Sequence, residues 1–151
     1  MSKIKEKTKS LYRNKKEPYN GKLFLREDSD EAWEFIDELE YSKLSNKDKE
    51  KVKLEEVEFC RPWWNLQKHV ESISTKMTLT GGSERDSVAY LENRIRYFLK
   101  KCSFIDLEFD KDESGFERIK PQMWEKIVGK EGLAPEILTG ILRVFVTKSP
   151  V

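Results

Sequence analysis

Apolar residues recur with helical spacing over residues 83–102, the longest stretch that one helical face can explain. The apolar stripe consists of Val88, Leu91, Ile95, Phe98, Leu99 and Cys102, and the residues off the stripe include Arg94, Arg96, Lys100 and Lys101. Gly81 and Gly82 precede this stretch, and Ser83 with Asp86 resembles a capping box, which satisfies the first unpaired amides of a helix. The pattern predicts a central helix with shorter amphipathic segments packed around it.

Helical spacing recurs in four other segments. Apolar residues at positions 32, 35, 36 and 39 predict a helix of about three turns, and Asp28 with Glu31 supplies a second capping-box pattern. Prolines introduce the other three helices, at Pro62, Pro121 and Pro135, because proline is favoured as the first helical residue. These signals give four helices in addition to the central one.

The signals for β-strands are shorter. Residues 22–26 and 54–59 alternate apolar and charged side chains, as a half-buried strand does. Residues 103–109 fit either a strand or the frayed end of the central helix, and residues 46–53 fit a short helix or a solvated loop. Asn20 and Gly21 form a dipeptide that favours a turn.

These patterns predict a mainly α protein: a compact helical domain of five or six helices with one or two short β-strands, behind a flexible basic N-terminal arm. The arm is residues 1–20, and residues 21–151 form a single α-rich domain. A chain of 151 residues that is 37% hydrophobic is long enough for one real core. The arm has too few apolar residues to offset the entropy of ordering it.

Positive charge is concentrated at the N-terminus. Residues 1–22 have a net charge of +6 and the whole chain +1, so the remainder carries −5. The basic residues of the arm are Lys3, Lys5, Lys7, Lys9, Arg13, Lys15 and Lys16. The arm fits a solubilising tail, or a segment that docks on an acidic protein surface or on nucleic-acid phosphates with release of counterions.

The two cysteines, Cys60 and Cys102, allow at most one disulfide bond. The sequence shows neither a signal peptide nor a run of roughly 18 apolar residues that would cross a membrane. These features favour the cytoplasm and free thiols, with Cys102 packed in the apolar stripe.

Motifs for metal binding or catalysis are incomplete. Asp110, Asp112, Ser114 and Gly115 begin like a calcium loop, but Pro121 stands where the bidentate glutamate should be, which leaves a charged turn. One histidine and two cysteines match no zinc template. We therefore expect no metal and no cofactor.

Two further chemical hypotheses remain open. Cys60 with His69, the only histidine, would make a nucleophilic dyad if the two side chains met; otherwise His69 is structural. Residues 81–83 would hold an anion if they opened a helix, although they lack the lysine and other glycines of a P-loop and also fit a plain loop.

The sequence Arg61-Pro62-Trp63-Trp64 is the feature that core packing alone explains least easily. Two adjacent tryptophans at the start of a helix point about 100° apart, so one core cannot easily bury both. A partly exposed tryptophan beside an arginine is typical of a hot spot in a protein–protein interface. Core-and-rim packing and base stacking remain the alternatives.

The order of these features resembles that of small tail-assembly chaperones and related tail or baseplate accessory proteins of tailed bacteriophages. The resemblance covers about residues 54–146, and it depends on the step Glu58-Phe59-Cys60-Arg61-Pro62-Trp63, on a long helix with Tyr90 early, and on the closing helix. Trp63-Trp64 replaces the single aromatic residue or threonine usual after the proline. The resemblance implies a mostly helical protein without enzymatic activity that binds another virion component, in the host cytoplasm or the virion.

We therefore expect a structural or assembly protein, not an enzyme, that binds a partner protein through Arg61, Trp63 and Trp64 and through the arm. The alternative is a nucleic-acid-binding module that uses the arm. Neither hypothesis includes a small-molecule substrate or a membrane.

Overall fold

The protein, described here from a computed structural model, is a mixed α/β fold built on a four-stranded antiparallel sheet of order β2-β1-β3-β6. The structure describes residues 18–27 and 33–148. The sheet strands are β1 (Tyr19–Glu27), β2 (Trp33–Ile36), β3 (Lys53–Phe59) and β6 (Leu99–Cys102). Two hairpins are formed by β4 (Thr75–Met77) with β5 (Ser83–Arg85), and by β7 (Phe109–Lys111) with β8 (Glu117–Ile119). The helices are α2 (Glu38–Ser42), α3 (Asn46–Lys49), α4 (Trp64–Ile73), α5 (Ser87–Phe98), α6 (Pro121–Val128) and α7 (Pro135–Lys148).

The prediction of a mainly α protein, and with it of an α-rich domain over 21–151, is wrong because β1 is the centre of a sheet. Strand β1 is longer than the expected 22–26 segment, and it pairs with β2 on one side and with β3 on the other. Asn20 and Gly21 are part of this strand and not of a turn, because they pair with Glu58 and Val57 of β3. Central pairing outweighs the local turn preference.

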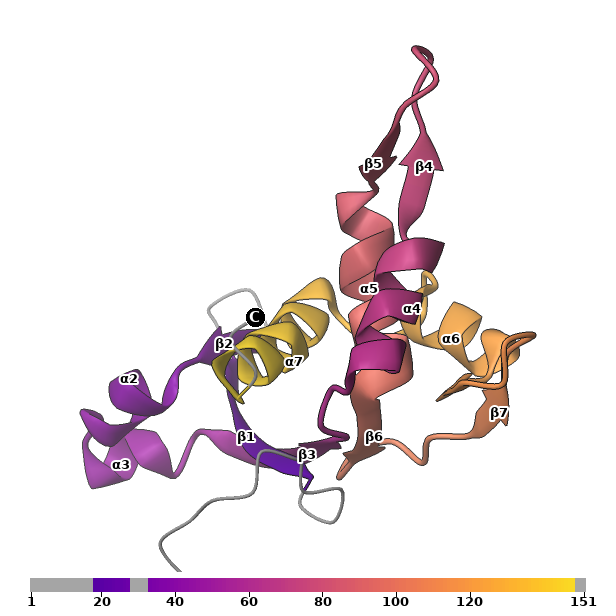
Figure 1. The fold of residues 1–151 in the computed structure, drawn as a ribbon. Coiled ribbons are helices and arrows are strands. Elements are labelled where there is room, and N and C mark those ends of the chain that lie inside the picture. The colour runs from indigo at the N-terminus through magenta and orange to yellow at the C-terminus, as the bar shows by residue number, and fades with distance from the viewer. Residues whose placement is uncertain (1–17, 28–32, 149–151) are drawn as a thin grey trace, which may run out of the picture.

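Helix α7 covers one face of the sheet (Figure 1). Gly21 and Gly140 mark the places where helix and sheet approach most closely, because a methyl group built on Gly21 would collide with Val144 and one built on Gly140 would lie 2.7 Å from Phe35. Phe145 then joins three elements: its ring lies 5.0 Å from those of Phe59 in β3 and Phe98 in α5. The core therefore lies between α7, the sheet and α5.

The predicted central helix over 83–102 is shorter than expected and has a strand at each end. Ser83 belongs to β5, and the N-cap is Asp86, whose carboxylate accepts from the amides of Val88 and Ala89. The segment after Phe98 leaves the helix to pair with β3 as β6. The predicted stripe is also rotated, because Val88 and Leu91 are exposed whereas Arg94 is buried.

The segment predicted as a helix from positions 32, 35, 36 and 39 contains strand β2 followed by the short helix α2. Phe35 and Ile36 pair with Leu25 and Phe24 of β1, and Asp37 caps α2. The predicted capping box of Asp28 and Glu31 lies outside the described residues. Three or four apolar residues at mixed spacing fit both the helical and the strand periodicity. In this segment the pairing with β1 determines that residues 33–36 form a strand.

The other sequence predictions agree better with the structure. The helices that begin at Pro121 and Pro135 are α6 and α7, the strand at 54–59 is β3, and residues 46–49 form α3. The hairpin of β4 and β5 extends beyond the ends of α4 and α5 (Figure 1). Within the described part of the chain, no helix combines the length and apolar character needed to cross a bilayer.

We predict that Gly21→Ala destabilises the fold by about 1–3 kcal/mol, because the added methyl group has no room beside Val144. Urea unfolding followed by circular dichroism measures this change. Gly82→Ala is the matched control, since the atom nearest to its new methyl group is the Thr78 hydroxyl oxygen at 3.4 Å. Equal effects of the two substitutions would contradict the close packing of α7 on β1.

Candidate functional site

The candidate site begins where β3 ends and α4 begins. Phe59 is completely buried, and the next residue, Cys60, donates its amide to the carbonyl of Phe98. Pro62 is not the first helical residue, as the sequence predicted; instead Trp63 is the N-cap with an extended backbone, and α4 begins at Trp64. The two tryptophans therefore lie at a corner whose backbone is fixed by the sheet and by α5.

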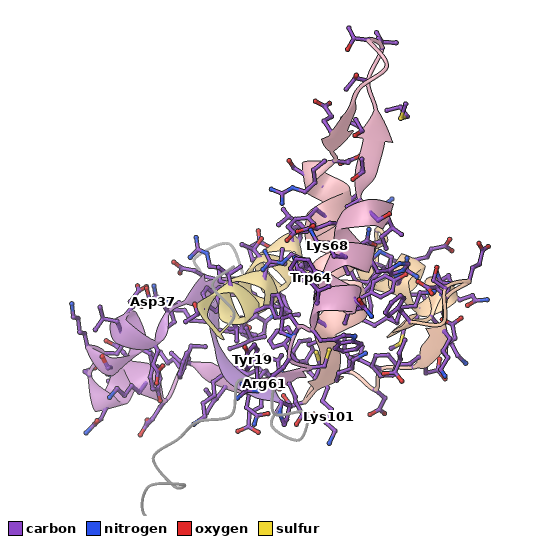
Figure 2. All side chains as sticks on the ribbon, viewed as in Figure 1. Tyr19, Asp37, Arg61, Trp64, Lys68 and Lys101 are labelled. Atoms are coloured by element: carbon purple, nitrogen blue, oxygen red, sulfur yellow. The ribbon has the colours of Figure 1, made fainter. Side chains whose placement is uncertain are left out.

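Two aromatic rings of this corner, Tyr19 and Trp64, each lie next to a cation. The guanidinium carbon of Arg61 lies 4.9 Å from the ring centre of Tyr19, and the ammonium nitrogen of Lys68 lies 4.7 Å from that of Trp64. Figure 2 shows both pairs, Tyr19 with Arg61 and Trp64 with Lys68. Trp64 is 73% exposed and Trp63 is 38% exposed. We call these five residues the aromatic corner.

The same type of contact continues onto α5. Gln67, one turn after Trp63, donates to the hydroxyl of Tyr90 at 3.2 Å. The guanidinium carbons of Arg85 and Arg94 lie 4.2 and 5.3 Å from the Tyr90 ring centre. Sequence analysis did not identify Arg85, Tyr90 and Arg94 as a group, because it placed Arg94 off the apolar stripe. The spacing of Tyr90, Arg94 and Tyr97 at i, i+4 and i+7 is the signal that could have identified this face.

The arm residues Lys3, Lys5, Lys7, Lys9, Arg13, Lys15 and Lys16 lie outside the described residues. Their contribution to a binding surface therefore stays a prediction. The part of the predicted arm that is described, residues 18–20, includes the start of β1, and Tyr19 from this part belongs to the aromatic corner.

His69 belongs to a partly buried network and does not pair with Cys60 as the dyad hypothesis required. Its Nε2 atom lies 2.6 Å from Oδ2 of Asp112, and its ring stacks on Phe116 at 4.4 Å. The hydroxyl of Tyr97 donates to the same Oδ2 atom at 2.7 Å. Cys60 has a different contact, because its Sγ atom lies 3.7 Å from the carbonyl oxygen of Tyr97. The geometry supports a structural histidine.

Asp112 connects α4, α5 and the β7–β8 hairpin. Its Oδ1 atom accepts from the amides of Ser114 and Phe116, which closes the hairpin turn. Burial would raise the pKa of Asp112, but the hydrogen bonds from Tyr97 and His69 lower that pKa to about 2. The carboxylate is therefore ionised at neutral pH, and Nε2 of His69 carries the shared proton.

The calcium-loop pattern at 110–115 forms this hairpin turn, with Gly115 at φ +87°. Both oxygens of Asp112 accept hydrogen bonds from protein groups, and Asp110 pairs with Arg118 at 3.2 Å. No group of three or more histidine, cysteine, aspartate or glutamate side chains suited to a metal ion occurs within residues 18–27 and 33–148. Burial raises the pKa of the Cys102 thiol to about 12, which keeps it protonated.

Residues 81–83 do not open a helix, so the hypothesis of an anion at a helix N-terminus is wrong. They belong to the β4–β5 hairpin, where Gly81 has φ +84° and Ser83 pairs with Met77. The hairpin carries two exposed apolar residues, Met77 and Leu79, which the sequence analysis did not identify as surface groups.

The sheet face opposite α7 is charged and open. Lys22 lies opposite Glu56, and Lys101 lies opposite Glu58, so opposite charges face each other across the strands. These residues line part of a broad hollow that is open to solvent, and residues of α7, among them Leu142 and Arg143, line another part of it. Opposite charges that face each other across strands stabilise a solvated sheet face by a few tenths of a kcal/mol to about 1 kcal/mol per pair.

Comparison with known families, curated proteins and solved structures gave no match to the chain. The candidate site therefore depends on the geometry of this chain alone.

We predict that Asp112→Asn destabilises the protein by about 2 kcal/mol at pH 7, because the native pKa of about 2 is below the ordinary 3.8. A lowered carboxylate pKa stabilises the native state above about pH 4, and this stabilisation is lost as the pH falls through 2. The difference between wild type and variant in urea unfolding should therefore shrink from pH 4 to pH 2.

Asp110→Asn is the matched control, because its ion pair with Arg118 is partly exposed and contributes less than about 1 kcal/mol. An Asp112→Asn effect that equals the control, or that does not change with pH, would contradict a network centred on Asp112.

Proposed function

We propose that this protein is a non-enzymatic binding protein that holds a partner protein through the aromatic corner. The observation that carries the proposal is Trp64, which is 73% exposed although its backbone is fixed at the start of α4. A rigid, exposed indole loses little conformational entropy on binding, and its surface is removed from water only when a partner covers it.

The neighbouring cations support a partner interface. Arg61 lies over the ring of Tyr19, and Lys68 lies over the exposed ring of Trp64. Hot spots combine tryptophan, tyrosine and arginine in this way, and a rim of charged groups selects a partner of opposite charge. The residues of the basic arm extend the same proposal to the N-terminus.

An assembly role of the tailed-phage type remains part of this proposal. The resemblance to tail-assembly chaperones implied a mostly helical fold, and that implication is wrong. The argument for partner binding therefore comes from the aromatic corner, and the kind of partner, another component of a larger particle, is the part that the resemblance contributes.

A second candidate function is single-stranded nucleic-acid binding by the arm together with the corner. The specific observation in its favour is the alternation of rings and cations: Tyr19 with Arg61, Trp64 with Lys68, and Tyr90 with Arg85. Bases stack on exposed rings, and phosphates pair with the cations between them.

We predict that Trp64→Ala weakens association with the partner protein by about 2 kcal/mol or more, because truncation removes the most exposed ring of the corner. Tagged full-length protein expressed in its native source is purified, its partner is identified by mass, and the affinity of that partner is measured by titration. Leu39→Ala is the control, since Leu39 is 66% exposed but belongs to α2. Unchanged partner affinity of the Trp64 variant would overturn the proposal.

The nucleic-acid candidate makes a different prediction. Binding to a labelled single-stranded oligonucleotide should fall by more than about tenfold between 50 and 200 mM salt and should be lost when residues 1–17 are deleted. That deletion leaves β1 intact. Absence of binding at low salt would exclude this candidate.

A further inference from the structure

Arg94 is a buried cation without an anionic partner among the residues that the structure describes. It is 8% exposed, and its Nε atom is buried without a hydrogen-bond acceptor. Its neighbours are two rings: the guanidinium carbon lies 5.3 Å from the centre of Tyr90 and 4.9 Å from that of Phe145. Among residues 18–27 and 33–148, no carboxylate or carbonyl oxygen accepts a hydrogen bond from this side chain.

Arg96 shows that this is not a general property of arginines on α5. Its Nε atom is also buried and unpaired, but its terminal nitrogen donates to the carbonyl of Ile119 at 3.2 Å. Arg94 has no such acceptor among the described residues, although only 8% of the residue is exposed. A charged guanidinium without an acceptor binds an oxyanion readily, through two parallel hydrogen bonds.

A second cation is located at the same ring. Arg85 is exposed and lies 4.2 Å from the Tyr90 ring centre, so Tyr90 has Arg85 and Arg94 as neighbours. Gln67 holds the hydroxyl of Tyr90 from α4, which connects this ring to the aromatic corner one helical turn away. A ligand that reached Arg94 would therefore lie close to the Tyr90 ring, which Arg85 also contacts.

We propose that Arg94 and Arg85 form a binding site for a carboxylate at the end of a partner's side chain or C-terminus. The proposal rests on the proposed partner-binding function and specifies an acidic segment as the part of the partner that is recognised. The small exposed fraction of Arg94 favours a carboxylate over a phosphodiester as the ligand. A phosphodiester carries sugars on both sides and needs an exposed row of cations, whereas a terminal carboxylate can enter a site where Arg94 is only 8% exposed.

The test uses full-length protein labelled with ¹⁵N and sodium acetate as the carboxylate probe, at pH 7 and constant ionic strength. The side-chain Nε–H resonance of Arg94, assigned by its loss in Arg94→Met, should shift saturably with acetate. Dimethyl phosphate, the phosphodiester probe, and inorganic phosphate should bind at least tenfold more weakly. Arg143→Met is the matched control, because Arg143 lies over a different ring, Phe35, at 5.8 Å, and this variant should leave the titration unchanged.

The proposal is overturned if acetate produces no saturable shift, if it shifts Arg143 equally, or if either phosphate probe binds as tightly. Arg94→Met should also keep or raise the thermal midpoint, because it removes a buried cation without an ion partner. A fall in the midpoint of several degrees would instead assign Arg94 a structural role. The titration needs no partner and should persist in Trp64→Ala, so its failure is separate from failure of the partner-binding proposal.

Discussion

The contact on which this structure depends is the packing of the Phe145 ring. It lies between Phe59 of the sheet and Phe98 of α5, and it holds α7 against both. Three buried rings in contact contribute several kcal/mol of burial. Because β3 leads directly into the aromatic corner and α5 carries Tyr90 and Arg94, this contact fixes both halves of the candidate site relative to each other.

The free-energy cost of burying the Arg94 cation without an ion partner is the reason to propose that this site binds a ligand. Removing one cation from water costs several kcal/mol, whereas each cation–π contact returns about 1–2 kcal/mol. Tyr90 and Phe145 therefore offset part of the cost and leave the rest. At the surface the balance differs, since Lys68 stays hydrated beside Trp64 and loses little by that contact. The corner and the buried arginine are connected through Tyr90, which accepts a hydrogen bond from Gln67 of α4 and lies beside Arg94.

The sequence was informative where local signals and tertiary packing agree. Pro121 and Pro135 predicted the two C-terminal helices, and the alternation at 54–59 predicted β3. The sequence-based predictions failed where strand pairing outweighs the helical spacing of apolar residues. The apolar residues after Phe98 continue a helical stripe, yet they form β6 because β3 offers an open edge. For the same reason, a short apolar cluster around Phe35 was interpreted as a helix, although β1 pairs with it.

The residues of the candidate site also divide into those that local sequence predicts and those that only the tertiary structure reveals. Arg61, Trp63 and Trp64 could be predicted because a proline and two adjacent tryptophans constrain a short segment. Arg94 could not, because an arginine on a helix is ordinarily solvated, and only the position of α7 shows that this one is covered. Tyr19 joins the corner through pairing of β1 with β3, which brings together residues forty positions apart.

The most direct measurement is amide hydrogen exchange of the full-length protein with and without its purified partner. The account predicts slower exchange, on binding, in peptides that cover residues 60–68 and 85–94, with no change in α2 and α3. Protection confined to the β4–β5 hairpin or to α2 and α3, with unchanged exchange at 60–68, would contradict a function centred on the aromatic corner.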